Sequence, residues 1–193
     1  MFILLKCYSV TLLNEMKKKL LILLKKEAFF NKKVKLSSGK ISNFYIDVRR
    51  VSLTPQGLYL ISSLIWKIIK NEKITAVGGP TLGADPIVSA LCLFSYRNKK
   101  PLKGFLIRKT PKKHGQRRLI EGCFLKEKDK VIIIDDVATT GESLIRAIEV
   151  LKKDKVKVEK AIVVVDREEG AKENLLKLRC PLISLFKKSD FFK

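Results

Sequence analysis

The sequence predicts an α/β domain in which a parallel central sheet is flanked by helices on both faces. Short apolar runs such as 131–134 are followed by a glycine-containing turn and then by a segment with helical periodicity, and this order repeats along residues 74–186. The runs are apolar throughout and do not alternate with polar residues. That pattern is typical of parallel strands that are buried on both faces.

The N-terminal region is expected to be helical. Apolar residues at helical spacing predict an amphipathic helix over about 13–28, and residues 1–15 are expected to form an extension, with Met16 as an alternative first residue. Charged residues interrupt the apolar runs of this region before they reach the roughly 20 residues that span a bilayer. No membrane partner is therefore expected.

A small cap is expected between this helix and the α/β region. Residues 33–51 alternate between apolar and polar around a Ser-Ser-Gly turn, which predicts a pair of short strands. Thr54 and Pro55 combine a capping hydroxyl with a proline in the first turn, so they predict the start of a helix that runs to about Lys70.

The remaining elements alternate along the chain. Helices are expected to follow the glycine turns near residues 83, 141 and 170, and strands are expected at 74–79, 102–109, 130–136, 157–166 and 181–186. The chain contains no internal repeat and no low-complexity linker. We therefore expect one domain over 16–193, with 16–53 contributing its N-terminal cap.

The amino-acid composition restricts the classes of binding partner and metal site that are possible, but it does not identify one partner. Lysine and arginine outnumber the acidic residues by 41 to 19, which gives a formal net charge of +22. Such an excess attracts polyanions, including phosphorylated metabolites, but it is also common on solvated lysine-rich surfaces. Four scattered cysteines and a single histidine exclude a zinc site with the usual ligand spacing and argue against a disulfide framework. The expected location is the reducing cytoplasm.

Two adjacent carboxylates stand at the end of the most apolar predicted strand. Ligands bind beyond the carboxyl ends of the strands in an open parallel sheet, and Asp135 and Asp136 lie at such an end. The turn at 137–141 exposes backbone N–H groups at the start of a helix, which favours a terminal phosphate. The carboxylates can accept hydrogen bonds from a vicinal diol, so the segment suits a ribose 5-phosphate. Further hydroxyl donors come from Thr139, Thr140 and Ser143.

A second interpretation is that the two acids form a Mg²⁺ site, as strand-end carboxylates do in many doubly wound domains. This interpretation accounts for Asp135 and Asp136 but not for the hydroxyl-rich turn after them. The ribose-phosphate interpretation accounts for both parts of the segment.

The whole segment 131–143, VIIIDDVATTGES, resembles the PRPP-binding signature of the type I phosphoribosyltransferases. Three further segments are similar to those of orotate phosphoribosyltransferases. RKTPKKHG at 108–115 resembles their mobile catalytic loop, LSSGKISNFYIDVR at 36–49 resembles the segment that lines the pyrimidine pocket, and DREEG at 166–170 resembles the place where orotate is held. The resemblance extends from Met16 onward and implies a Rossmann-like type I phosphoribosyltransferase fold whose N-terminal cap forms a hood.

The resemblance implies a reaction and a set of phosphoribosyl-binding residues. PRPP would transfer its 5-phosphoribosyl group to orotate, giving orotidine 5′-phosphate and pyrophosphate in pyrimidine (UMP) biosynthesis, with Mg²⁺ as the cofactor. Mg²⁺ would be held mainly by PRPP, without a dedicated protein ligand. The residues implied in binding PRPP at the strand end are Asp135, Asp136, Val137, Ala138, Thr139, Thr140, Gly141, Glu142 and Ser143.

The base would be held beside this segment. The resemblance implies that Thr139 and Arg167 contact orotate. The planar guanidinium of Arg167 suits the carboxylate of orotate, with which it can form two parallel hydrogen bonds.

The pyrophosphate would be covered by the basic loop, which we define as residues 108–118. The resemblance implies that Arg108, Lys112 and His114 close over it and bind PRPP, and that Lys109 does so from the neighbouring subunit of a homodimer. Such a loop would stabilise the leaving pyrophosphate and keep water from the activated sugar. The catalytic candidates are therefore Arg108, Lys109, Lys112, His114, Asp135 and Asp136.

Two positions depart from the family pattern. Ser37 stands where many members have a lysine, and Gly83 stands where the family often has a lysine that contacts PRPP. We expect no substrate contact from the side chain at either position.

Two other functions remain open at this point. A phosphoribosyltransferase for a purine or for uracil would share residues 131–143 but would not be expected to have the basic loop. A PRPP-sensing regulator that binds nucleic acid would suit the net charge. The chain shows no second domain that resembles a helix-turn-helix, so no specific nucleic acid is expected as a partner.

Overall fold

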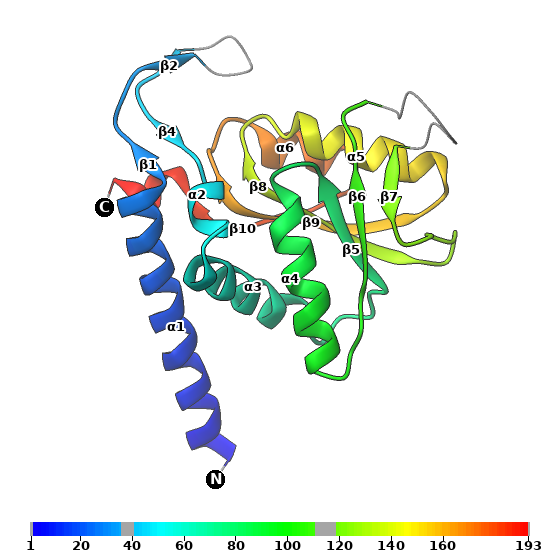
Figure 1. The fold of residues 1–193 in the computed structure, drawn as a ribbon, viewed down its shortest axis with the longest axis horizontal. Coiled ribbons are helices and arrows are strands. Elements are labelled where there is room, and N and C mark those ends of the chain that lie inside the picture. Colours follow the sequence, from blue (N-terminus) through cyan, green and yellow to red (C-terminus); the bar gives the residue numbers. More distant parts are fainter. Residues whose placement is uncertain (1, 36–40, 111–118, 193) are drawn as a thin grey trace.

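The central sheet lies between two layers of helices (Figure 1). The computed structural model describes residues 2–35, 41–110 and 119–192. Within these residues the sheet has six strands in the order β10-β9-β8-β5-β6-β7. The strands are β5 (Ala76–Pro80), β6 (Lys103–Ile107), β7 (Ile120–Gly122), β8 (Lys130–Ala138), β9 (Lys157–Asp166) and β10 (Leu182–Lys187).

The predicted parallel sheet is confirmed, with one addition at its edge. All neighbouring strands from β10 to β6 are parallel. β7 pairs antiparallel with β6, with Ile107 opposite Ile120. The basic loop therefore connects two adjacent antiparallel strands at one edge of the sheet.

The apolar run of β8 contributes to the core on both faces of the sheet. Successive side chains of a strand point to opposite faces. Ile132 and Ile134 pack in the core below α1, α3 and α4, whereas Val131 and Ile133 pack in the core below α5 and α6. These helices are α1 (Phe2–Glu27), α3 (Pro55–Ile69), α4 (Ala84–Arg97), α5 (Glu142–Lys153) and α6 (Ala171–Lys177).

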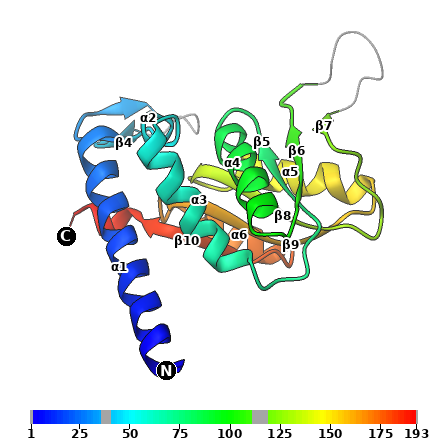
Figure 2. The same cartoon turned by 60° about the horizontal axis from the view of Figure 1, so that its bottom comes forward.

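The N-terminal helix is longer than predicted. α1 begins at Phe2 and continues without a break past residue 15, so the expected boundary between 1–15 and the domain does not coincide with the end of an element. Leu20 and Leu24 are fully buried in the core. The first half of α1 projects away from the sheet in both views (Figures 1 and 2). No helix in the described ranges has the length and apolar character needed to cross a membrane.

The predicted strand pair of the hood is present. β2 (Val34–Lys35) pairs antiparallel with β3 (Ile41–Ser42), and β1 (Phe29–Phe30) pairs antiparallel with β4 (Tyr45–Ile46). The turn between β2 and β3, which contains Ser37, lies outside the described residues. After β4 the chain forms the short helix α2 (Arg49–Ser52).

The start of α3 follows the sequence prediction. The Thr54 side chain accepts a hydrogen bond from the backbone N–H of Gly57 at 3.1 Å, and Pro55 occupies the first turn. The helix ends at Ile69, one residue before the predicted end.

An aromatic cluster connects the hood to the C-terminal end of the domain. The Phe29 ring lies 6.0 Å from that of Phe44, 5.6 Å from that of Phe191 and 5.5 Å from that of Phe192. Phe191 belongs to a 3-10 helix, η1 (Lys188–Phe191), which follows β10. The hood is thereby fixed beside the carboxyl ends of β9 and β10.

Candidate functional site

The two acids lie within β8, close to its end. β8 continues to Ala138, three residues beyond Asp135. The backbone N–H of Asp136 donates to Oδ1 of Asp135 at 2.9 Å, and the N–H of Val137 donates to Oδ1 of Asp136 at 2.8 Å. These bonds fix the orientation of both carboxylates.

Burial makes both carboxylates harder to ionise. Desolvation raises the pKa of Asp135 well above its ordinary value, the charge of Asp136 raises it further, and the Lys109 ammonium opposes the shift. Desolvation also raises the pKa of Asp136, and the Arg49 guanidinium acts in the opposite direction. The pair therefore favours any ligand group that donates hydrogen bonds to it.

Gly83 leaves the space that these carboxylates occupy. A Cβ atom at this position would lie 2.7 Å from Cγ of Asp136 and would also overlap carboxylate oxygens of both acids. A side chain at position 83 would therefore require the carboxylates of Asp135 and Asp136 to shift from the positions that they have here.

The hydroxyl-rich turn connects β8 to the N-terminus of α5. Gly141 has φ = +81° and is the residue that precedes α5, a conformation that glycine adopts at low cost. The Asn174 side chain of α6 donates to the carbonyl of Thr140 at 3.0 Å. Thr139 and Thr140 are half-buried, and Glu142 and Ser143 are exposed in the first turn of the helix. Residues 139–143 thus form a turn at a helix N-terminus, which suits an anion.

Arg167 lies beside this turn because β9 pairs with β8. Its backbone N–H donates to the carbonyl of Ala138 at 2.9 Å. Its side chain is 3% exposed, and Nε is 3.0 Å from Oε1 of Glu169. The guanidinium carbon lies 4.5 Å from the centre of the Phe44 ring, which belongs to the hood. The structure therefore brings Arg167 and the acids of β8 to the same edge of the sheet and covers Arg167 with the hood.

The first residues of the basic loop lie at the end of β6. Nη1 of Arg108 is 3.7 Å from Oε1 of Glu121 on β7. Lys109 is exposed, and its carbonyl accepts a hydrogen bond from the side chain of Arg146 on α5. The predicted residues Lys112 and His114 lie outside the described part of the chain.

Comparison with known proteins identifies the family. The phosphoribosyl transferase domain family matches residues 49–183. The orotate phosphoribosyltransferase of Aquifex aeolicus is 43% identical over 156 residues, which cover 81% of this chain and 85% of that protein. The chain belongs to the orotate phosphoribosyltransferases.

Solved structures agree with this assignment. The orotate phosphoribosyltransferase of Mycobacterium tuberculosis H37Rv in complex with Fe(III) dicitrate has a TM-score of 0.79 and 31% identity, and the match covers 91% of this chain and 98% of that chain. The same protein in complex with PRPP has a TM-score of 0.75 and 28% identity, with 92% and 99% covered. The predicted family and the type I phosphoribosyltransferase fold are confirmed.

The donor set at the site does not form a complete metal site. Among the described residues, no group of three or more histidine, cysteine or acidic side chains could hold a metal ion. Mg²⁺ in such sites is usually bound through one or two carboxylates together with phosphate and water. Asp135 and Asp136 could supply at most such a pair, and the remaining ligands would come from phosphate and water.

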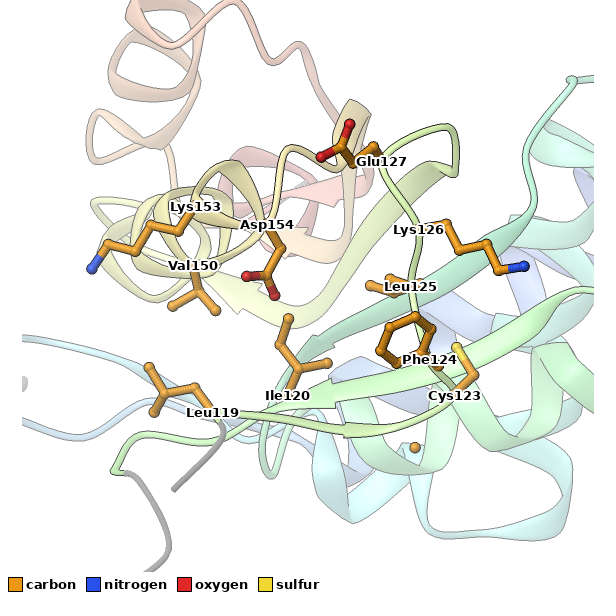
Figure 3. Close-up of a pocket in the computed structure, with 11 residues that line it drawn as sticks. Leu119, Ile120, Cys123, Phe124, Leu125, Lys126, Glu127, Val150, Lys153 and Asp154 are labelled. Atoms are coloured by element: carbon orange, nitrogen blue, oxygen red, sulfur yellow. The ribbon is translucent and has the colours of Figure 1, made fainter. Parts of the chain in front are cut away.

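A further pocket lies away from the predicted site. It has a volume of about 820 Å³ and is formed by β7, the segment after it and α5. Figure 3 shows Asp154 pointing toward Ile120 across this pocket. None of the predicted site residues lines it, so we do not assign it to the transferase site.

Sequence reasoning missed three contributors to the site. Phe44 covers Arg167, Asn174 supports the turn at Thr140, and Arg49 acts electrostatically on Asp136. Phe44 and Arg49 lie in the segment that resembled the pyrimidine-pocket segment, but no spacing rule singled them out. Asn174 carries no motif, because its role depends on the packing of α6 against the turn.

Replacing Asp135 by asparagine should stabilise the fold at neutral pH. The raised pKa means that the folded protein binds this proton more tightly than the unfolded chain, so the free energy of unfolding falls as pH rises from the ordinary carboxyl value to the raised one. The Asp135→Asn variant keeps the oxygen that accepts from Asp136 and loses this penalty. Urea denaturation should show a stabilisation of the variant at pH 7.5 that shrinks toward pH 4.

The Asp135→Asn variant should also bind PRPP more weakly than the parent. A gain in stability together with a loss of PRPP binding would show that Asp135 serves ligand binding and not the fold. A variant that is less stable than the parent at pH 7.5, or equally stable at both pH values, would contradict the predicted penalty.

Proposed function

We propose that the protein transfers the 5-phosphoribosyl group of PRPP to orotate and releases orotidine 5′-phosphate and pyrophosphate, a step of pyrimidine biosynthesis. The observation that carries the proposal is the juxtaposition of three features at one sheet edge. They are the paired carboxylates of β8, the hydroxyl-rich turn before α5, and the guanidinium of Arg167 after β9. The family assignment supports orotate as the base in preference to a purine or uracil.

PRPP is the expected donor. Its 5-phosphate would accept hydrogen bonds from the backbone and hydroxyls of residues 138–143, while its ribose hydroxyls would donate to Asp135 and Asp136. The M. tuberculosis relative has been solved in complex with PRPP, which supports this part of the proposal.

Orotate would bind between this turn and the hood. Its carboxylate would pair with Arg167, and Thr139 would contact the ring. Because Arg167 is covered by Phe44 and paired with Glu169 in this structure, the carboxylate can reach the guanidinium only if the hood segment shifts. Orotate reacts through a ring nitrogen that can carry negative charge, so no nucleophilic side chain is needed.

Departure of pyrophosphate requires added positive charge. The leaving group becomes more negative as the bond to ribose breaks, and cations placed near it stabilise the transition state. Arg108, Lys109, Lys112 and His114 of the basic loop would supply this charge and exclude water. Mg²⁺ bound to the diphosphate would supply further charge, since orotate phosphoribosyltransferases are generally Mg²⁺-dependent.

The protein would act as a homodimer in the cytoplasm. Large apolar side chains are exposed along α3, α4 and the segment before α4, and these are Tyr59, Leu82, Leu93 and Tyr96. Exposed apolar side chains on neighbouring elements favour contact with a second copy. Cys92, Cys123 and Cys180 are free thiols, which suits a reducing compartment.

Mixing the protein with PRPP, Mg²⁺ and orotate should give PRPP-dependent loss of the orotate absorbance band. Chelation of Mg²⁺ should stop the reaction. Consumption of adenine, hypoxanthine or uracil with orotate untouched would overturn the base assignment. Salt-sensitive binding of random DNA without any turnover would favour the regulator instead.

Replacement of Arg167 should separate the two substrates. We expect the Arg167→Lys variant, which keeps the charge but loses the two-bonded geometry, to raise the KM for orotate about 10-fold or more, with a much smaller change in the KM for PRPP. Steady-state kinetics with each substrate varied in turn measures the difference. Equal changes in both constants would show that Arg167 only supports the fold.

Hybrid dimers should show whether Lys109 acts across the interface. The Lys109→Ala and Asp136→Asn variants should each be nearly inactive. After subunit exchange, half of the dimers are hybrids, and each has one site with both defects and one with neither, so about a quarter of the parent activity should return. If hybrids form and no activity returns, Lys109 serves Asp136 of its own chain.

A further inference from the structure

The order of the strands indicates where the diphosphate of PRPP lies. Arg167, the expected partner of the base, follows β9 on one side of β8. β5 is the neighbour of β8 on the other side, and β6, which leads into the basic loop, comes next. The base attacks C1 of the ribose from the side opposite the leaving group. The diphosphate is therefore expected on the β5 side of the two acids.

A pocket of about 820 Å³ lies on that side. One wall is formed by the segment after β5 and the first turns of α4, including Leu82 and Asp85, which flank Gly83. Gly83 in turn lies against the carboxylates of Asp135 and Asp136. The other lining residues come from the segment after β4, from α2 and from the residues before α3, and they are Asp47, Arg49, Arg50, Leu53 and Thr54.

Arg49 is the cation of this pocket that is held in a defined orientation. Its Nε donates to Oδ1 of Asp47 at 2.9 Å, and its side chain is 42% exposed. Among the described residues, Asp47 is the one hydrogen-bond partner that its side chain has. The carboxylate of Asp47, and more weakly that of Asp136, raises the pKa of Arg49, so the guanidinium is charged. Its Nη groups are available to an anion in the pocket.

The neighbouring Arg50 provides a contrast. It lines the same pocket, but its guanidinium carbon lies 5.0 Å from the centre of the Phe30 ring in the hood. Its charge is directed toward the hood.

A second source of positive potential faces the same space. α4 begins at Ala84, so the positive end of its helix dipole lies here, although the N–H of Asp85 donates to the carbonyl of Leu82 and Pro86 has no N–H. An anion between Gly83 and Arg49 would thus meet a helix N-terminus on one side and a guanidinium on the other.

We propose that Arg49, oriented by Asp47, is a further substrate-binding residue that contacts the diphosphate of PRPP and the pyrophosphate product. The inference rests on the proposed function, since it takes its ligand from that reaction. Arg49 lies on α2, next to the hood, and not in the basic loop. It would supply positive charge to the diphosphate from a separate element of the fold.

Binding of Mg²⁺-pyrophosphate, measured by isothermal titration calorimetry, tests the proposal directly. The Arg49→Gln variant should bind about 10- to 100-fold more weakly than the parent, as expected for loss of a charge-assisted hydrogen bond. The KM for PRPP should rise by a similar factor, while the KM for orotate should stay within about 2-fold. The Arg50→Gln variant removes the same charge from the neighbouring position and should bind pyrophosphate like the parent.

Two further variants separate binding from support of the fold. The Arg49→Lys variant should recover part of the pyrophosphate affinity. The Asp47→Asn variant, which loosens Arg49 but keeps its charge, should lose less affinity than Arg49→Gln. Equal losses in the Asp47→Asn and Arg49→Gln variants, accompanied by a lower Tm, would show that the pair only stabilises α2 and would overturn the proposal. Unchanged pyrophosphate binding in Arg49→Gln, or an equal loss in Arg50→Gln, would also overturn it.

The calorimetric measurement keeps this inference distinct from the proposed function. If the parent binds pyrophosphate through Arg49 but leaves orotate untouched, the role of Arg49 is supported and the assignment of orotate as the base is wrong. If the parent converts orotate and the Arg49→Gln variant binds pyrophosphate normally, the proposed function is supported and the role of Arg49 is wrong.

Discussion

Two neighbouring carboxylates buried at the end of one strand impose the main constraint on this molecule. Ionised acids at such a position are costly, and their cost is reduced by the backbone N–H groups of Asp136 and Val137 and by nearby cations. The carboxylates lie directly against Gly83, where a Cβ atom would come within 2.7 Å of Cγ of Asp136. A ligand with hydroxyl donors would reduce the remaining cost, which agrees with the proposed binding of ribose beside these acids.

The sheet brings the elements of the proposed reaction to adjacent strands. β9 leads to Arg167, β8 carries the two acids and the hydroxyl-rich turn, β5 leads to the N-terminus of α4, and β6 leads into the basic loop. Since parallel strands end at the same edge, neighbours in the sheet become neighbours in the site. In the proposed reaction, the order of these strands in the sheet would match the order of base, ribose, diphosphate and basic loop.

The elements predicted correctly depend on local patterns. The apolar run of β8, the glycine before α5 and the Thr54 cap of α3 are visible in consecutive residues, and the structure has each of them. The antiparallel β7 was not predicted, because three residues give no measurable periodicity. Phe44 over Arg167 and Asn174 at Thr140 depend on contacts between distant segments, which no local spacing encodes. The close approach of Gly83 to the two acids likewise became visible only in the structure.

The aromatic cluster of Phe29, Phe44, Phe191 and Phe192 has a consequence for the order of folding. It joins the hood to the segment after β10, and the whole central sheet lies between these two segments in the sequence. Closing so long a loop costs more entropy than pairing strands that are closer in sequence. The strands β5 to β9 can therefore pair before the hood is fixed in place. The edge that carries the two acids then becomes ordered before Phe44 covers Arg167.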